Sequence, residues 1–190
     1  MAGHDAAALV PVLARAFCTG SVAAWAQPDE ARRLDYNEAL FAALFEEVFE
    51  RRQIDVEGEP PVAVAVWARP GTWKLTPDEA GAVRERLKSA LGPHLERVGA
   101  AFEEVDRRHP AVPHWYLAFL GVEPDRQGQG HGAGLLRRGL RRCDEAGEAA
   151  YLWTAERRNV GFYEAHGFAV SWAAPVPGGP PAWGMWRDPR

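Results

Sequence analysis

Apolar residues recur at helical spacing over the first part of the chain. Leu9, Val12, Leu13 and Phe17 share one helical face and Gly20 follows as a stop signal, so a helix is predicted over residues 5–18. A longer amphipathic helix is predicted around residues 29–52, where acidic side chains lie opposite an apolar face made of Leu34, Leu40, Phe41, Leu44, Phe45, Val48 and Phe49. Both helices are expected to bury one face in a common core.

Apolar runs bounded by glycine and proline divide the rest of the chain. The connector after the second helix is read as polar and is closed by Glu59-Pro60-Pro61. The predicted strands are 62–68, 115–122, 149–154, 167–172 and 183–186, and the last two are expected to form a hairpin. Helices are predicted in two segments of 76–106 that are divided at Gly92-Pro93, in the segment after Gly134, and over 159–166. This order predicts an α/β fold, a mixed sheet covered by helices, in a single domain spanning 1–190.

Composition narrows the class of protein. With 190 residues, 47% of them hydrophobic, the chain is long enough for one substantial core. A net charge of −4 argues against nucleic acid or an anionic membrane as the main partner and favours a small molecule. Cys18 and Cys143 suggest neither a disulfide nor a zinc site, and no metal is expected. No export signal or membrane span is recognised, so a cytoplasmic protein is expected. Whether it forms a homodimer stays open.

The segment 114–134, HWYLAFLGVEPDRQGQGHGAG, carries the clearest chemistry. A strand leads through a polar exit into four alternating glycines, Gly128, Gly130, Gly132 and Gly134, and then into a helix. Such a loop exposes backbone N–H groups beside the unpaired N–H groups of the helix N-terminus, so it predicts a site for phosphate.

The glycines also allow three other interpretations. Gly128-x-Gly130-x-x-Ala133, with Glu148 about 20 residues on, matches a dinucleotide-binding fingerprint, but that loop follows its strand directly and comes early in a βαβ unit. A P-loop is excluded because no Gly-Lys-Ser/Thr follows, and a flexible linker is a weak interpretation between a strong strand and a strong helix.

Two motifs in order resemble the GCN5-related N-acetyltransferase (GNAT) superfamily. The first is Gln127-x-x-Gly130-x-Gly132, and the second is Asn159-x-x-Phe162-Tyr163 followed by Gly167-Phe168. The segments 63–71, 114–136, 162–170 and 177–189 are similar to the puromycin N-acetyltransferase branch. The superfamily begins with a β-strand before its first helix, whereas this chain begins at the helix, so that strand is expected to be absent or lost to a misplaced start.

The resemblance implies a splayed mixed sheet and acetyl-CoA as co-substrate. Its implied cofactor-binding residues are Leu120 and Val122 for the pantetheine, Gln127, Gly128, Gly130, Gly132 and Ala133 for the pyrophosphate, and Asn159. Arg126 and the helix arginines Arg137, Arg138, Arg141 and Arg142 are candidates for the other phosphates, although a solvated helix face explains them better.

Tyr163 is the implied catalytic residue, which protonates the departing CoA thiolate. A tyrosine with a pKa near 10 is a weaker acid than a thiol near 8.5, so full proton transfer is uphill by about 2 kcal/mol and a hydrogen bond to the thiolate is the larger effect. The structural alternatives are a core aromatic for Tyr163 and a helix cap for Asn159.

The general base and the acceptor stay open at this stage. Tyr116 occupies the position where some relatives carry a glutamate, and it is a poor base. The other residues considered are Glu103, Glu104, His109 and His114 for the base, Tyr36, Phe41, Trp67, Trp115 and Trp153 for stacking on an acceptor, and Asp35, Glu46 and Glu47 for its charge.

The resemblance implies an enzyme, an N-acetyltransferase that transfers acetyl from acetyl-CoA to the primary amine of a small molecule by direct attack in a ternary complex. Antibiotic-like or other xenobiotic amines are examples of such an acceptor. The alternatives are a protein N-terminal or lysine acetyltransferase and a non-catalytic acyl-CoA-binding module.

Overall fold

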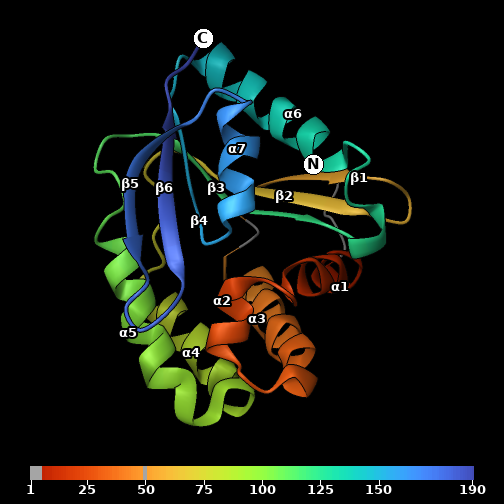
Figure 1. The fold of residues 1–190 in the computed structure, drawn as a ribbon, viewed down its shortest axis with the longest axis vertical. Helices are drawn as coiled ribbons and strands as arrows, with labels where there is room; N and C mark the ends of the chain where they lie inside the picture. Colours follow the sequence, from red (N-terminus) through yellow and green to blue (C-terminus); the bar gives the residue numbers. More distant parts are fainter. Residues whose placement is uncertain (1–5, 49–50) are drawn as a thin grey trace.

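A six-stranded sheet in the order β1-β2-β3-β4-β6-β5 runs through the molecule, as the computed structural model of residues 6–48 and 51–190 shows (Figure 1). The strands are β1 (Gln53–Glu57), β2 (Ala63–Ala68), β3 (Trp115–Val122), β4 (Ala150–Thr154), β5 (Ala169–Pro175) and β6 (Pro181–Arg187). Neighbouring strands are antiparallel except β3 and β4, which are parallel. The predicted mixed α/β sheet is confirmed.

Helices cover the two faces of this sheet. They are α1 (Ala6–Phe17), α2 (Ser21–Ala26), α3 (Arg33–Glu47), α4 (Pro77–Leu91), α5 (Leu95–Asp106), α6 (His131–Ala146) and α7 (Arg157–Glu164). Figure 1 shows α1 to α5 gathered on one side, with α6 and α7 on the other. The two faces have separate cores, because α6 and α7 pack with β2, β3 and β4 in one apolar cluster and α1 and α3 pack with β2 in another. Within the described residues, no helix is long and apolar enough to cross a bilayer.

The predicted helices and strands are found with shifts at their ends, and the sequence did not indicate the strand β1 or the short helix α2. The sequence predicts a polar connector at Gln53–Glu57, because only two of these five residues are apolar. Asp55 is nevertheless buried, since Arg142 of α6 covers it. The second helix, expected around residues 29–52, begins at Arg33 after a 3-10 turn at Glu30–Arg32 and ends at Glu47, earlier than expected. The place of Phe49 on its apolar face and the strand expected before the first helix lie outside the described residues.

Two α6 arginines bind β1. Arg142 forms a two-bond pair with Asp55 at 2.9 and 2.6 Å, and Arg138 donates to Glu57 at 3.1 Å and to the Val56 carbonyl at 3.3 Å. The expectation that these two arginines only form a solvated helix face is corrected, because each is ion-paired with β1, and contact of the helix arginines with cofactor phosphates stays a prediction. Their charges are used to hold the edge strand against the helix, while Arg137 and Arg141 are exposed.

The prediction that Asn159 caps the helix of the second motif is also wrong. Helix α7 begins at Arg157, and its N-cap residue is Glu156, so Asn159 lies inside the first turn. Because Asn159 does not cap α7, its side chain remains available for another role.

We expect Gly139→Ala to destabilise the protein. A Cβ at this α6 position would collide with the ring of Trp67, which is fully buried on β2. Overpacking of this kind costs about 1–3 kcal/mol, measurable as the free energy of unfolding in urea. Gly134→Ala in the same helix is the control, since a Cβ there meets nothing within 4 Å and should be neutral or stabilising by up to about 1 kcal/mol. Equal stability of the two variants would contradict this packing.

We also expect Asp144→Asn to destabilise the protein in a pH-dependent way. The Asp144 carboxylate accepts two bonds from buried Arg187, at 2.8 and 2.9 Å, and these bonds lower the pKa of Asp144. The stabilisation is therefore complete above the unfolded pKa, near 4, and is lost as the pH falls through the lower folded value. At pH 7 the variant should lose about 1.5–3 kcal/mol in urea unfolding, and the difference from wild type should shrink below about pH 4. A difference independent of pH would count against the ion pair.

Candidate functional site

Strands β3 and β4 diverge in the middle of the sheet. They are paired only at their starts, through Trp115 with Ala150 and Tyr116 with Tyr151. On its other side β3 stays paired with β2 up to Val122, with one register shift that leaves Ala118 as an extra residue between Leu117 and Phe119. The β4 side of β3 is consequently left facing a gap, which is the splay that the sequence motifs predicted.

Hydrogen-bond alternation shows which β3 residues face this gap. The Glu123 N–H donates to the Val62 carbonyl at 2.9 Å, so the next pair, Ala63 and Val122, is a non-hydrogen-bonded pair. Because antiparallel pairs alternate, Leu120 opposite Ala65 is also non-hydrogen-bonded. The main-chain groups of Leu120 and Val122 therefore point away from β2, toward the side from which β4 has diverged.

The glycine loop follows β3 after the 3-10 turn Pro124–Arg126 and leads into α6. Gly128 and Gly130 have φ of +75° and +90°, and a Cβ at either would meet nothing within 4 Å. Gly130 is the N-cap of α6 and has no side chain to satisfy the helix, so the N–H groups of the first turn, including those of Gly132 and Ala133, are free to bind an anion. Gln127 braces the loop by donating from Nε2 to the Val122 carbonyl at 3.1 Å.

A cavity of about 160 Å³ lies at the splay. Its walls come from β3 at Leu117–Leu120, from the end of β4 at Trp153–Glu156, and from α1, α2, α3, α5 and α7. The remaining lining residues are Phe17, Val22, Ala23, Tyr36, Asn37, Leu40, Phe41, Phe102, Asn159 and Tyr163. The cavity thus connects the strand gap with both predicted α7 residues.

Tyr163 reaches the cavity from within the α6–α7 core. Its ring packs edge-on against Phe162 and Phe168, at centroid distances of 5.1 and 5.9 Å, and only 8% of the residue is exposed. Burial raises the pKa of Tyr163, so its hydroxyl keeps its proton throughout the neutral range. The structure combines the two interpretations of Tyr163, because the ring is part of the core and the residue also lines the cavity.

The sequence did not indicate Glu156, which lines the same cavity beside Thr154. Its Oε1 accepts a hydrogen bond from the Ser21 N–H at the start of α2, at 2.5 Å. The sequence signal that could have identified it is its place directly after β4, because ligands in sheets of this kind bind beyond the carboxyl ends of parallel strands.

The histidines considered as bases form a separate cluster. His109 Nε2 lies 2.8 Å from His114 Nε2, and His114 Nδ1 donates to the Val112 carbonyl at 2.7 Å. His114 Nε2 is therefore the acceptor and His109 Nε2 the donor. Burial, with a smaller contribution from His114, lowers the pKa of His109 to about 3, and neither histidine lines the cavity. Tyr116 contacts His109 edge-on and also lies outside the cavity lining.

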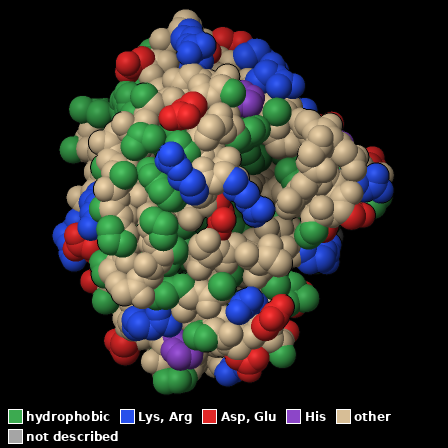
Figure 2. All heavy atoms as spheres, viewed as in Figure 1, with side chains coloured by type: hydrophobic (Ala, Val, Ile, Leu, Met, Phe, Trp, Pro, Cys, Tyr) green, Lys and Arg blue, Asp and Glu red, His purple; other side chains and the backbone are tan. Residues whose placement is uncertain are grey.

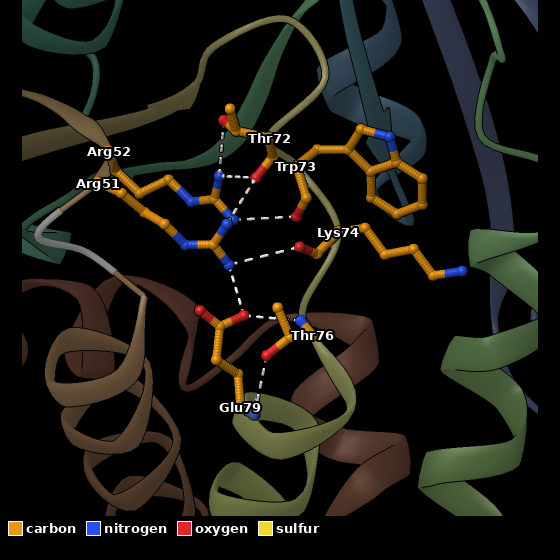
Figure 3. Close-up of polar contacts among 7 residues, drawn as sticks. All are labelled: Arg51, Arg52, Thr72, Trp73, Lys74, Thr76 and Glu79. Carbon is orange, nitrogen blue, oxygen red and sulfur yellow. Dashed lines mark hydrogen bonds and ion pairs between the residues drawn. The ribbon is translucent and has the colours of Figure 1, made fainter.

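A loop held by two arginines supports this cluster (Figure 3). Arg52 donates to the carbonyls of Thr72 and Trp73, and Arg51 donates to Glu79 at 2.5 Å. Trp73 stacks on His109 with ring centroids 3.5 Å apart. Burial, reinforced by the neighbouring Arg51, lowers the pKa of Arg52 to about 10. These contacts hold the loop against the cluster of His109, His114 and Tyr116 at the start of β3. We therefore assign the cluster a structural role.

The acceptor candidates divide between the cavity and other places. Tyr36, Phe41 and Trp153 line the cavity. The other two aromatic residues do not, since Trp67 packs under α6 and Trp115 donates to Glu148 at 2.7 Å. The acidic candidates Asp35, Glu46 and Glu47 also lie outside the cavity lining. Glu46 and Glu47 form ion pairs with Arg86 instead. Glu104 pairs with Arg107 and Arg108.

Comparison with known proteins gives a consistent result. Residues 95–168 match the model of the acetyltransferase (GNAT) family. A solved structure from Corynebacterium glutamicum, described as histone acetyltransferase HPA2 and related acetyltransferase, is 30% identical, with 98% of this chain and 92% of that one covered and a TM-score of 0.73. Arylalkylamine N-acetyltransferase 2 from Aedes aegypti is 10% identical, with 97% and 94% covered and a TM-score of 0.64, which shows a shared fold.

Proposed function

Because the chain belongs to the GNAT family of acetyltransferases, we propose that it transfers the acetyl group of acetyl-CoA to the primary amine of a small molecule. The observation that carries the proposal is the cavity at the β3–β4 splay, which lies between the gap-facing main chain of Leu120 and the hydroxyl-bearing Tyr163. Amine and thioester would meet there in a ternary complex.

The glycine loop fits the pyrophosphate of CoA. Space is open around Gly128 and Gly130, and the first turn of α6 directs N–H groups to the same place. We assign the pyrophosphate to the loop 127–133, with Gln127 as its brace, and the pantetheine to the main chain of Leu120 and Val122. The Val122 carbonyl already accepts from Gln127, so the groups of Leu120 and the Val122 N–H remain for the pantetheine.

Tyr163 is proposed to donate a hydrogen bond to the sulfur as the C–S bond breaks. Since burial raises the pKa of Tyr163, full proton transfer to a thiolate is less favourable than for a free tyrosine, and stabilisation of the developing charge is the main effect. Asn159, on the same wall of the cavity, is proposed to bind the pantetheine arm by its amide. Direct transfer of this kind needs no metal.

A small acceptor is favoured by the cavity, which is little larger than one aromatic ring and mostly apolar. The face in Figure 2 carries hydrophobic, basic and acidic side chains interspersed, without a broad surface of one charge that would suit a nucleic acid.

A protein amine is the second candidate, because the 30%-identical relative is described as a histone acetyltransferase. The same proposal includes membership of the puromycin N-acetyltransferase branch, a single-domain organisation and a cytoplasmic location.

The test is thiol release from acetyl-CoA with panels of small amines and of peptides, together with mass spectrometry of the products. We expect release that depends on a small amine and one acetyl group added to that amine for each thiol. Acetylation of peptides without any small amine would favour the second candidate. Tight binding of acetyl-CoA without acetylation of either panel would indicate a non-catalytic acyl-CoA-binding module.

A further inference from the structure

Glu156 is the one charged side chain among the described residues that line the cavity. It follows β4 at the point where the chain turns into α7, and its N–H donates to Thr154 Oγ1 at 3.1 Å. Its Oε1 accepts from the Ser21 N–H at 2.5 Å. The first bond fixes the backbone of Glu156, and the second fixes the direction of its carboxylate and uses only one of the two carboxylate oxygens.

The second oxygen is weakly held. Within the described parts of the chain, the ion-pair partner of Oε2 is Arg158, whose Nε lies 4.0 Å away and whose side chain is 72% exposed. Solvent-exposed pairs at such distances contribute little. An anionic oxygen beside apolar walls gains most from a cation that can donate a hydrogen bond to it, and a primary ammonium group is such a cation.

The rest of the cavity limits what the ammonium group can carry. Aromatic and aliphatic side chains form most of the wall, including Phe17, Tyr36, Phe41, Phe102 and Trp153. The amide Nδ2 of Asn37, another lining residue, is already used, since it donates to the Ala14 carbonyl at 3.2 Å. A volume of about 160 Å³ accommodates roughly one ring. Molecules with several hydroxyl groups or a second charge would leave polar groups without partners there.

Resting on the proposed function, we propose that Glu156 is the specificity-determining residue for the acceptor, binding the ammonium group of a small monoamine with an aromatic or branched apolar body. One carboxylate oxygen remains on α2, the other receives the ammonium, and the apolar body lies among the aromatic rings. The ammonium nitrogen is thereby held at the splay, on the side of the cavity that Tyr163 also lines.

The test compares an amine with its neutral analogue. Binding of 2-phenylethylamine and of 2-phenylethanol is measured by calorimetry at pH 7, with and without CoA, on the wild-type protein and on Glu156→Gln. The glutamine can still accept from the Ser21 N–H, so the cap on α2 is kept and only the charge is removed. We expect the wild type to prefer the amine by about 10- to 100-fold and Glu156→Gln to lose this preference while its affinity for acetyl-CoA is unchanged.

Ser21→Pro is the matched control. Ser21 is the first residue of α2, and Gly20 before it has φ −70° and ψ 153°, which suits a following proline. This variant replaces the N–H bound to Glu156 by the proline Cδ, which displaces the carboxylate but keeps its charge, so the preference for the amine should fall less than in Glu156→Gln. A merely structural role for Glu156 predicts the reverse, with Ser21→Pro affected and Glu156→Gln normal.

Several results would overturn the inference. The wild-type protein alone would overturn it by binding 2-phenylethanol as tightly as 2-phenylethylamine, or by binding neither. Tighter binding of spermidine or glucosamine than of 2-phenylethylamine would also overturn it. These results do not depend on the folding of any variant. Failure of the proposed function looks different, since CoA would not bind while the Glu156-dependent preference for the amine could still be measured.

Discussion

Tyr163→Phe is expected to lower kcat by about 100- to 1,000-fold while leaving the affinity for acetyl-CoA within a factor of a few. The ring contacts with Phe162 and Phe168 survive the substitution, because phenylalanine has the same ring. What is lost is the hydroxyl of a residue that lines the cavity, and we propose that this hydroxyl meets the negative charge that develops on sulfur. Steady-state kinetics with an identified amine, together with calorimetric binding of acetyl-CoA, separates the two quantities.

Tyr151→Phe is the matched control for this substitution. Tyr151 is fully buried in β4, and its hydroxyl accepts a hydrogen bond from Trp172 at 3.0 Å, outside the cavity lining. The control should therefore lose about 1 kcal/mol of unfolding free energy and keep its kcat. If Tyr163→Phe turned over as fast as Tyr151→Phe, Tyr163 would be only a core aromatic residue.

Gly130→Val is expected to weaken acetyl-CoA binding by about 10- to 100-fold. Gly130 has φ +90° and caps α6, and a β-branched residue in this conformation is strained, so the loop must rearrange. Rearrangement moves the N–H groups that would hold the pyrophosphate, and each charge-assisted hydrogen bond lost costs about 1.5–3 kcal/mol. Calorimetric titration with acetyl-CoA measures the effect.

Gly147→Val tests the same strain at the other end of the helix. Gly147 is the C-cap of α6 with φ +65°, and a Cβ there also meets nothing within 4 Å. Both variants should lose a similar amount of stability, about 1–2 kcal/mol, whereas only Gly130→Val should lose affinity. Equal affinities in the two variants would remove the glycine loop from the binding site.

The sequence predicted those parts of the fold that depend on local pattern. The apolar run placed β3 with its observed bounds, whereas the helix expected after Gly134 begins earlier, at His131. The family resemblance of the motifs led to the observed splay. Strand β1 could not be predicted in this way, because its formation depends on Arg142 and Arg138, which lie more than 80 residues away and neutralise its acidic side chains. A polar segment becomes a strand here through tertiary pairing.

The acceptor side of the site shows the same limit. Tyr36, Phe41 and Trp153 could be named as aromatic candidates, but Trp67 and Trp115 were equally good from the sequence and point elsewhere. The sequence analysis did not identify Glu156, because its place after β4 is a weak local signal that does not show what its side chain contacts. Its significance depends on the cavity that α2, α3 and α5 close around it, and that arrangement exists only in the folded chain.

The most direct test of the central claim is a crystal structure of the protein with CoA. We predict the pyrophosphate against the N–H groups of residues 130–133, the pantetheine along Leu120 and Val122 in the gap beside β4, and the sulfur in the cavity beside Tyr163. CoA bound away from the splay, or a sulfur that does not reach the cavity of Tyr163, would contradict the account.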